Sequence, residues 1–511
     1  MYRTDENDTG GYYFSPFDLQ LLSKAPLLAA AGINALKIEG RMKSAEYVGT
    51  VVRAYRKVID SIKDNSGIEK ATAEANTILQ GDFARKKTTY YFDDTHNASS
   101  VDRAAEEAIF DPASDGGTGI RLGVIKKVRG APGGKEGLVD CTAYTPQAAD
   151  SIRLHKADDS LRVSFKLTSV EKAGAANSCW LSIPDGFDLT DCVYIIQIKN
   201  NSRHYAQFIK SGSGYSKRQP GHERAPFVQY QFKKSSPVKQ GAPRKKFLEP
   251  FKEGIYTAVS RIEDMYTAQS IRTQGLILSL NNKIIKQLTG ERKPLPFKPQ
   301  ETILSLDPYC TQNDEDLLCT LLHKFIENGY NRFIVNNLSH LPLLKNTETH
   351  LIAGPYLYTF NRFSAAFLQD ANLSYFVSPF ENNRQNLERT WETGERNNIF
   401  VPVFAYPPLF KISGELNYGA KKFYDKNDEQ FRLINESGRA AVFAEIAFSI
   451  VDKIPFLKQA GFKHFIIDFS GPPLNKQDYK AVISGAENAQ PLAGTSRFNW
   501  KNGFFEPEEK K

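Results

Sequence analysis

Residues 15–55, SPFDLQLLSKAPLLAAAGINALKIEGRMKSAEYVGTVVRAY, organise our interpretation of the whole chain. A short apolar helix is expected over residues 26–31, and Gly32 can end it with a positive φ. Residues 35–38 then predict a brief strand. Residues 44–64 predict a longer helix, because their apolar side chains recur every three or four positions. The stretch therefore predicts a helix–strand–helix unit.

A charged tripeptide, Glu39-Gly40-Arg41, follows the predicted strand at its carboxyl end, where α/β barrels and open α/β sheets place their chemistry. Glu39 and Arg41 can reach one cavity, and Lys37 lies on the same alternating face of the strand. Arg41 could hold a carboxylate or phosphate with two hydrogen bonds, while Glu39 orients the guanidinium or acts as an acid or base. We predict Glu39, Arg41 and Lys37 as catalytic candidates. The alternative is a structural ion pair at a barrel rim.

These residues carry a resemblance to a known family. SPFDLQLL, followed by PLLAAAGINALKIEGRMKSAEYVGTVVRAYRKVID, resembles the signature region of the collagenase-like peptidase family U32. Residues 37–44, KIEGRMKS, match the last element of that signature residue for residue. Residues 83–91 are similar, more loosely, to a further element of the family, F-N-R-G-F-T-x-G-Y.

The resemblance implies that residues 1–115 are the last units of a TIM-like barrel, followed by a β-barrel domain. Family members carry roughly a barrel's worth of chain before this signature, including four cysteines that resemble iron–sulfur ligands. We expect a truncated, split or misannotated reading frame, with no cofactor in this chain and an iron–sulfur cluster in the full-length family member. The alternative is a barrel completed by another part of the chain or by a partner.

Composition sets outer limits on the class of protein. The chain has 511 residues, enough for about three domains, and 41% of them are hydrophobic. Residues 25–33 are the longest nearly apolar stretch, far short of the ~20 residues of a membrane span. The polar amino terminus and five scattered cysteines predict a cytoplasmic protein without membrane contact. Neither the cysteines nor His323 and His464 have metal-ligand spacing, so we predict no metal site.

The positive charge is concentrated between Arg203 and Pro250. Residues 203–250 hold eleven Lys or Arg against two Glu, a net charge of +9 where the whole chain has +8. Aromatic residues are interleaved with the cations, a composition that can bind phosphates and unpaired bases. We predict RNA as a possible partner of this basic linker or loop, and a small anionic cosubstrate at Arg41. The alternative is a solvated linker whose aromatic residues pack on neighbouring domains.

Two further folded regions flank this segment. Short runs rich in β-formers over residues 116–202 predict a small antiparallel β-barrel or sandwich. Over residues 251–490 an alternating βα pattern predicts a second, degenerate TIM-like barrel, before a polar tail at residues 491–511. The expected elements of this region are a helix from residue 254 through 271 and strands at residues 302–306, 332–336, 351–353, 374–377, 399–404, 440–444 and 463–467.

The second barrel region contains an internal repeat of the opening unit. A shift of 429 positions places Pro26 on Pro455 and Glu39 on Asp468 without a gap, although the rest of the charged tripeptide is not kept. We interpret this as a barrel that keeps the scaffold and has lost the ligands. The alternative is a chance similarity between βα units.

Three functions remain open at this point. The sequence contains no nucleophile elbow, zinc-protease helix, phosphate loop or dinucleotide fingerprint, so peptidase activity rests on the resemblance alone. Several family members are associated with hydroxylation of a pyrimidine in tRNA or rRNA, using an iron–sulfur cluster and prephenate. The resemblance implies this reaction for the parent protein, and an anionic cosubstrate suits Arg41. The alternatives are a collagenase-like protease and a catalytically inactive scaffold or RNA-binding remnant.

Overall fold

The computed structural model forms two compact units, residues 1–2 with 9–232 and residues 3–8 with 233–511. It describes residues 2–6, 10–40, 45–80, 87–89, 92, 109–110, 112, 119–132, 134–141, 144–158, 160–174, 177–197, 250–270, 273–289, 295–309, 312–413, 415–416, 418–419, 421–436 and 439–496. The predicted basic segment up to residue 249 lies outside the described residues, as do residues 497–511 of the predicted tail.

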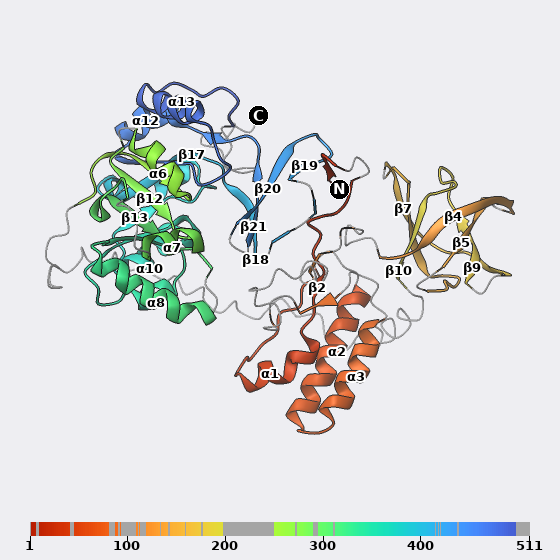
Figure 1. The fold of residues 1–511 in the computed structure, drawn as a ribbon. Helices are drawn as coiled ribbons and strands as arrows, with labels where there is room; N and C mark the ends of the chain where they lie inside the picture. The colour runs from red at the N-terminus through yellow and green to blue at the C-terminus, as the bar shows by residue number, and fades with distance from the viewer. Residues whose placement is uncertain are drawn as a thin grey trace, which may run out of the picture. The chain divides into compact units, whose positions relative to one another are not determined.

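The first unit opens with a group of three helices, α1 (Ala25–Ala30), α2 (Ala45–Lys63) and α3 (Ile68–Gln80) (Figure 1). The first two confirm the helices predicted over residues 26–31 and 44–64. The buried side chains of the three helices, with Leu22 just before α1, form one small cluster that includes Val58 and Leu79. A two-residue strand, β2 (Asp18–Leu19), pairs in parallel with β3 (Lys87–Thr88).

The same unit contains seven antiparallel strands in the order β7-β6-β10-β4-β5-β9-β8. These are β4 (Ile120–Ala131), β5 (Gly134–Asp140), β6 (Ser151–His155), β7 (Arg162–Lys166), β8 (Val170–Ala173), β9 (Ser178–Ile183) and β10 (Cys192–Gln197). All seven contribute apolar side chains to one core, as expected of a small β-barrel domain.

The second unit is built on eight parallel strands that close into a barrel, because β16 pairs with β17 (Figure 1). In barrel order they are β11 (Gly254–Val259), β12 (Gly275–Ser279), β13 (Thr302–Ser305), β14 (Arg332–Val335), β15 (His350–Ala353), β16 (Tyr375–Val377), β17 (Ile399–Ala405) and β23 (His464–Asp468). This confirms the predicted βα barrel in its coarse form.

Helices surround this barrel. Its apolar side chains form two separate layers, one inside the strands and one between the strands and the helices. One layer, with Ile277, Ile334 and Ile466, fills the inside, and the alternate residues of the same strands pack outward against the helices. The helices are α6 (Ile262–Gln269), α7 (Asn282–Thr289), α8 (Gln312–Glu327), α9 (His340–Leu343), α10 (Arg362–Asp370), α11 (Arg384–Thr390), α12 (Ile454–Gln459) and α13 (Lys476–Glu487). No helix of the described part of the chain has the length and apolarity to cross a membrane.

Two predictions for this region are wrong. The helix expected from residue 254 is the strand β11, and the helix α6 begins only at Ile262. A parallel strand that is buried on both faces shows no alternation, so its apolar run looks helical. The predicted barrel strand at residues 440–444 instead belongs to a separate sheet with the order β1-β19-β20-β21-β18. Its strands are β1 (Arg3–Thr4), β18 (Pro408–Ser413), β19 (Lys422–Tyr424), β20 (Gln430–Glu436) and β21 (Arg439–Ala444).

Candidate functional site

The opening unit and the last βα segment of the barrel share one local geometry. A 3₁₀ turn at Leu22–Lys24 leads into α1, and a 3₁₀ turn at Val451–Lys453 leads into α12, with starting positions that differ by 429. Both helices carry a proline in the first turn. Both end at a glycine with positive φ, 82° at Gly32 and 100° at Gly461. The repeat predicted from sequence is therefore also a repeat of backbone conformation.

Beyond the two glycines the chain takes different conformations. After Gly461 it enters β23, which pairs with β11 on one side and β17 on the other. After Gly32 the predicted strand at residues 35–38 is wrong, because residues 33–40 form no strand. A strand exists only where a neighbour accepts and donates its backbone hydrogen bonds. Among the described residues none pairs with this segment.

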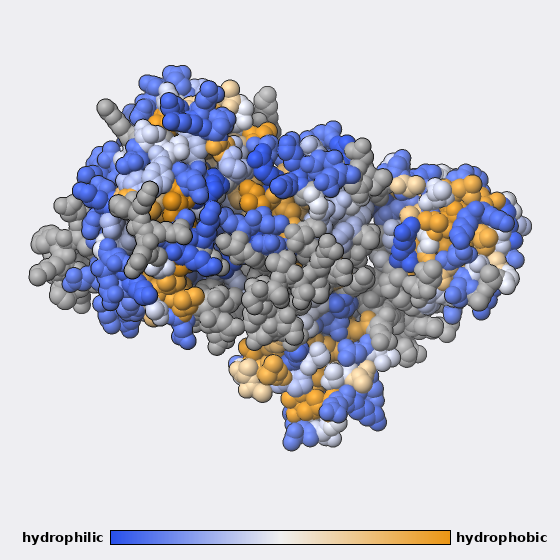
Figure 2. Space-filling model, in the orientation of Figure 1, coloured by the Kyte–Doolittle hydropathy of each residue, from blue (hydrophilic) through white to orange (hydrophobic). Residues whose placement is uncertain are grey.

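The opening segment and its repeat in the barrel also differ in burial. Phe462 and Phe465, after α12, are fully buried in the barrel core. Their counterparts Ile33 and Leu36 are exposed by 50% and 36%. Figure 2 shows apolar surface, in orange, over the region of α1. The opening unit therefore presents apolar side chains that the described part of the chain does not cover.

The predicted site residues lie at the end of this exposed segment. Lys37 Nζ lies 2.9 Å from Glu39 Oε1, and the two side chains are 86% and 74% exposed. The hydrogen bond from Lys37 to Glu39, with the attraction of the carboxylate, raises the pKa of the lysine. Arg41 lies outside the described residues. The structure thus brings Lys37 and Glu39 together on an open surface, and their catalytic role stays a prediction.

Asp468, the counterpart of Glu39, occupies the position that barrel enzymes use. It ends β23, and its side chain lies on the same face of the strand as Ile466, which packs inside the barrel. Asp468 Oδ1 accepts hydrogen bonds from the backbone N–H of Ser470, at 2.8 Å, and from the Ser470 hydroxyl. Burial raises the pKa of Asp468, while the two Ser470 hydrogen bonds and the nearby Lys411 oppose that rise.

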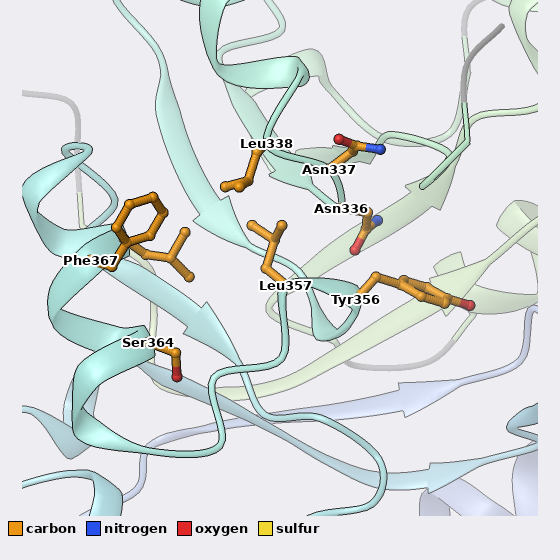
Figure 3. A pocket seen from close by; sticks show the side chains of 8 residues that line it. Asn336, Asn337, Leu338, Tyr356, Leu357, Ser364 and Phe367 are labelled. Carbon is orange, nitrogen blue, oxygen red and sulfur yellow. The ribbon is translucent and has the colours of Figure 1, made fainter. Parts of the chain in front are cut away.

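A cavity of about 370 Å³ lies beyond the carboxyl ends of β14 and β15 (Figure 3). It is lined by Asn336, Asn337, Leu338, Tyr356, Leu357, Ser364, Phe367 and Leu368. The sequence places Asn336 at the end of a predicted strand, and we assigned it no role there. The pair Asn336-Asn337 directly after an apolar strand was the signal that could have revealed it, since polar residues at this end of a barrel strand face the mouth.

The described residues do not fit an iron–sulfur cluster. They contain no group of three or more His, Cys, Asp or Glu arranged to hold a metal ion. Cys141 and Cys179 are buried free thiols, and burial raises the pKa of Cys141 to about 12. A cluster needs thiolates, which such an environment disfavours. His464 is also buried, and its Nε2 lies 3.3 Å from the carbonyl oxygen of Phe251.

The fold is thus that of an α/β protein with a parallel barrel and a separate opening unit that carries the charged tripeptide. Residues 1–102 match the model of peptidase family U32, which confirms the resemblance for this part of the chain. Over 69 residues the chain is 46% identical to the tRNA hydroxylation protein P1 of Bacillus subtilis (strain 168). This alignment covers 12% of this chain and 16% of that protein.

A second curated relative is an uncharacterized protease of Methanocaldococcus jannaschii, 41% identical over 61 residues, or 12% of this chain and 15% of that protein. Both alignments therefore span about one sixth of the relative's length. Among solved structures, orotidine 5'-monophosphate decarboxylase from Metallosphaera sedula aligns with 47% of this chain and 100% of its own, at 12% identity and a TM-score of 0.24. The spore cortex-lytic enzyme SleL of Bacillus megaterium QM B1551 aligns with 48% of this chain over 75% of its own, at 12% identity and a TM-score of 0.26. Likenesses of this size say nothing about function.

Proposed function

We propose that the chain takes part in the hydroxylation of a pyrimidine in tRNA or rRNA. The observation that carries this proposal is the 46% identity over 69 residues with the tRNA hydroxylation protein P1. The motif KIEGRMKS at residues 37–44 lies within the segment that matches family U32. The exposed apolar side chains of this segment, Ile33 and Leu36, favour a working form in which further strands cover it.

In that form Arg41 binds an anionic cosubstrate, for which prephenate is our candidate. A guanidinium can make two parallel hydrogen bonds to one carboxylate, whereas the ammonium of Lys37 is already engaged by Glu39 at 2.9 Å. Glu39 orients the cation or moves a proton. We assign no iron–sulfur cluster to the described residues, because they offer no ligand set. The basic segment between Arg203 and Pro250 would contact the phosphates of the RNA.

A gene deletion followed by mass spectrometry of total RNA nucleosides tests the proposal. We expect loss of one hydroxylated pyrimidine and its return when the unaltered gene is supplied. Glu39→Gln and Arg41→Lys should fail to restore it. Glu69→Gln, which alters an exposed carboxylate on α3, is the matched control and should restore it. An unchanged nucleoside profile in the deletion strain would remove the hydroxylation proposal.

The match to an uncharacterized protease favours one alternative, a collagenase-like protease. Gelatin cleavage by the purified protein, abolished by Glu39→Gln and retained by Glu69→Gln, would support it. An unchanged RNA profile without gelatin cleavage would leave the third possibility, an inactive scaffold. The two assays therefore separate all three functions.

A further inference from the structure

The seven strands of the small β-barrel domain (Figure 1) differ in charge along the sheet. The strands β4, β6, β7 and β10 contain seven Lys or Arg and no Asp or Glu. The strands β5, β8 and β9 contain two Lys against three Asp or Glu. Because β7-β6-β10-β4 are neighbours in the sheet, one half of the domain carries the excess of positive charge.

Side-chain alternation along these four strands sets which way their cations point. The residues that pack in the core include Leu122, Ile152, Leu154, Val163, Phe165, Val193 and Ile195. Because successive side chains of a strand point to opposite faces, the neighbours of these residues point outward. The outward cations are Arg121, Arg153, Arg162 and Lys166, of which Arg153 is half-buried and the others are exposed. We call this surface of β7-β6-β10-β4 the outer face.

Strand register brings cations of the outer face together around Tyr194. On β10 this residue is directly opposite Arg121 of β4 on one side and Arg153 of β6 on the other. Residues opposite each other in neighbouring antiparallel strands have Cβ atoms about 5 Å apart, so both side chains begin beside the tyrosine. Arg153 is also opposite Ser164 of β7, and its Nε donates to Ser164 Oγ at 2.8 Å. A row of Arg, Tyr and Arg thus crosses three neighbouring strands.

Aromatic rings lie among these cations. The ring centroids of His155 and Tyr194 are 4.6 Å apart, and Tyr194 is half-buried. Burial raises the pKa of Tyr194 to about 12, so its hydroxyl is neutral at physiological pH. The hydroxyl of Tyr12, from the amino-terminal segment, accepts a hydrogen bond from Arg162 Nη2 at 3.2 Å. The outer face therefore combines neutral rings with cations.

The chemistry of the outer face suits single-stranded RNA. Guanidinium and ammonium groups bind phosphates, and aromatic side chains on a sheet pack against unpaired bases. The strand β10 also leads into the basic segment, which begins at Arg203, six residues after Gln197. We propose that the outer face binds single-stranded RNA, with phosphates on its four cations and a base or ribose against Tyr194. RNA is the expected polyanion because of the proposed function, on which this proposal rests.

Binding of a fluorescein-labelled single-stranded RNA, of mixed sequence and about 12 nucleotides long, is measured by fluorescence anisotropy on the full-length protein. The test variant, Arg121→Gln with Lys166→Gln, removes two exposed cations of the outer face. The matched control, Lys135→Gln with Lys172→Gln, removes two exposed cations of β5 and β8 and leaves the same net charge. Circular dichroism confirms that each variant is folded.

The test variant should bind the RNA about tenfold more weakly than the unaltered protein. Its slope of log Kd against log salt concentration should fall by about 1.4, since each phosphate contact with a single strand contributes about 0.7. The control variant should keep both the affinity and the slope. Tyr194→Leu, which removes the ring and keeps an apolar side chain, should weaken the RNA about fivefold without changing the slope. The salt slope thus separates the role of charge from that of the ring.

Absence of RNA binding by the full-length protein would overturn the proposal, as would equal binding by the two double variants. Tighter binding of a duplex RNA of the same length would also overturn it, because unpaired bases would then not be recognised. Binding of polyglutamate in place of RNA would mean an acidic protein partner.

This proposal and the proposed function fail in different assays. Loss of a hydroxylated pyrimidine in the deletion strain, with equal RNA binding by the two double variants, would remove the outer face and keep the proposed function. An unchanged nucleoside profile, with a binding defect confined to the Arg121→Gln and Lys166→Gln variant, would remove the proposed function and keep the outer face.

Discussion

The structural repeat predicts that equal truncations at paired positions have very unequal costs. Phe462 and Ile33 follow Gly461 and Gly32, and each donates its backbone N–H to the carbonyl five residues earlier at 3.0 Å. Their local geometry is therefore the same, while Phe462 is 0% exposed and Ile33 is 50% exposed. Replacing each with alanine separates tertiary packing from local conformation.

The expected magnitudes follow from burial. Phe462→Ala empties a fully buried site and should lower the free energy of unfolding of the barrel by about 3–5 kcal/mol. The Arg396 guanidinium, 5.5 Å from the centre of the Phe462 ring, loses a further favourable contact. Ile33 keeps half of its surface in water, so Ile33→Ala should cost roughly 1 kcal/mol or less, and only in its own unit.

Hydrogen exchange read by mass spectrometry suits this comparison, because the chain has two units and one unfolding midpoint would mix them. Peptides that cover β17 and β23 report on the barrel. Exchange there through global opening should accelerate about 10²- to 10⁴-fold in Phe462→Ala, as a loss of about 3–5 kcal/mol requires. The same peptides should be unaffected by Ile33→Ala.

Two outcomes would refute the reasoning. If Ile33→Ala accelerated exchange in β17 and β23 as Phe462→Ala does, the opening unit would be part of the barrel core. If Phe462→Ala left the barrel peptides unchanged, the burial of Phe462 would not represent the protein in solution. Phe367→Ala, at a side chain that is 60% exposed on α10, is a control for truncation of a ring on the same unit.

Three further predictions use other features. Gly354→Ala should destabilise the barrel by about 1–3 kcal/mol in denaturant unfolding, because the alanine Cβ would collide with Asn336 and lie 2.8 Å from Ile334 Cγ2. The backbone is not the cause, since the φ of −76° at this position suits alanine. Burial lowers the pKa of His464, so the unfolded state binds its proton first and the barrel should lose stability as the pH falls below about 6.5. His464→Phe should reduce that loss when unfolding is compared at neutral and mildly acidic pH. Glu39→Gln should leave hydrogen exchange in peptides that cover α2 and α3 unchanged, since an exposed ion pair contributes little, and faster exchange there would mean a structural role.

The helices of the opening unit could be predicted well because their information is local. The periodicity of residues 44–64 predicts a helix, and α2 spans Ala45–Lys63. The apolar stripe that makes the pattern also packs on α3, which follows it directly in sequence. Neighbours in sequence are neighbours in space here, so one window of residues holds both the pattern and its partner.

Strands were harder, since their partners lie far away in sequence. Residues 35–38 have the composition of a strand and form none, whereas residues 254–259 have a helical pattern and form β11. β11 pairs with β12 nearby and with β23, which begins at His464, far along the chain. A local pattern cannot show whether such a partner is present, and without it the backbone groups stay solvated.

The candidate site of the barrel could not be predicted from the sequence for the same reason. The repeat aligned Asp468 with Glu39, and we interpreted it as a barrel that has lost its ligands. The Asn336 side chain is held by hydrogen bonds to Ser305 and Leu306 and packs against Gly354. These three residues lie on the two strands beside its own or directly after them. Their adjacency is a property of the closed sheet, so no single stretch of sequence contains it.

Glu39 and Asp468 show what the sheet adds to a local motif. Both follow a 3₁₀ turn, a short proline-led helix and a glycine of positive φ. At Asp468, on a strand paired with β11 and β17, burial raises the pKa of the carboxyl group, whereas Glu39 is 74% exposed. The motif therefore positions an acid, and the neighbouring strands decide whether it is desolvated. A catalytic role for Glu39 thus requires strands on both sides of residues 35–39, which makes strand pairing, more than the identity of the tripeptide, the condition for activity.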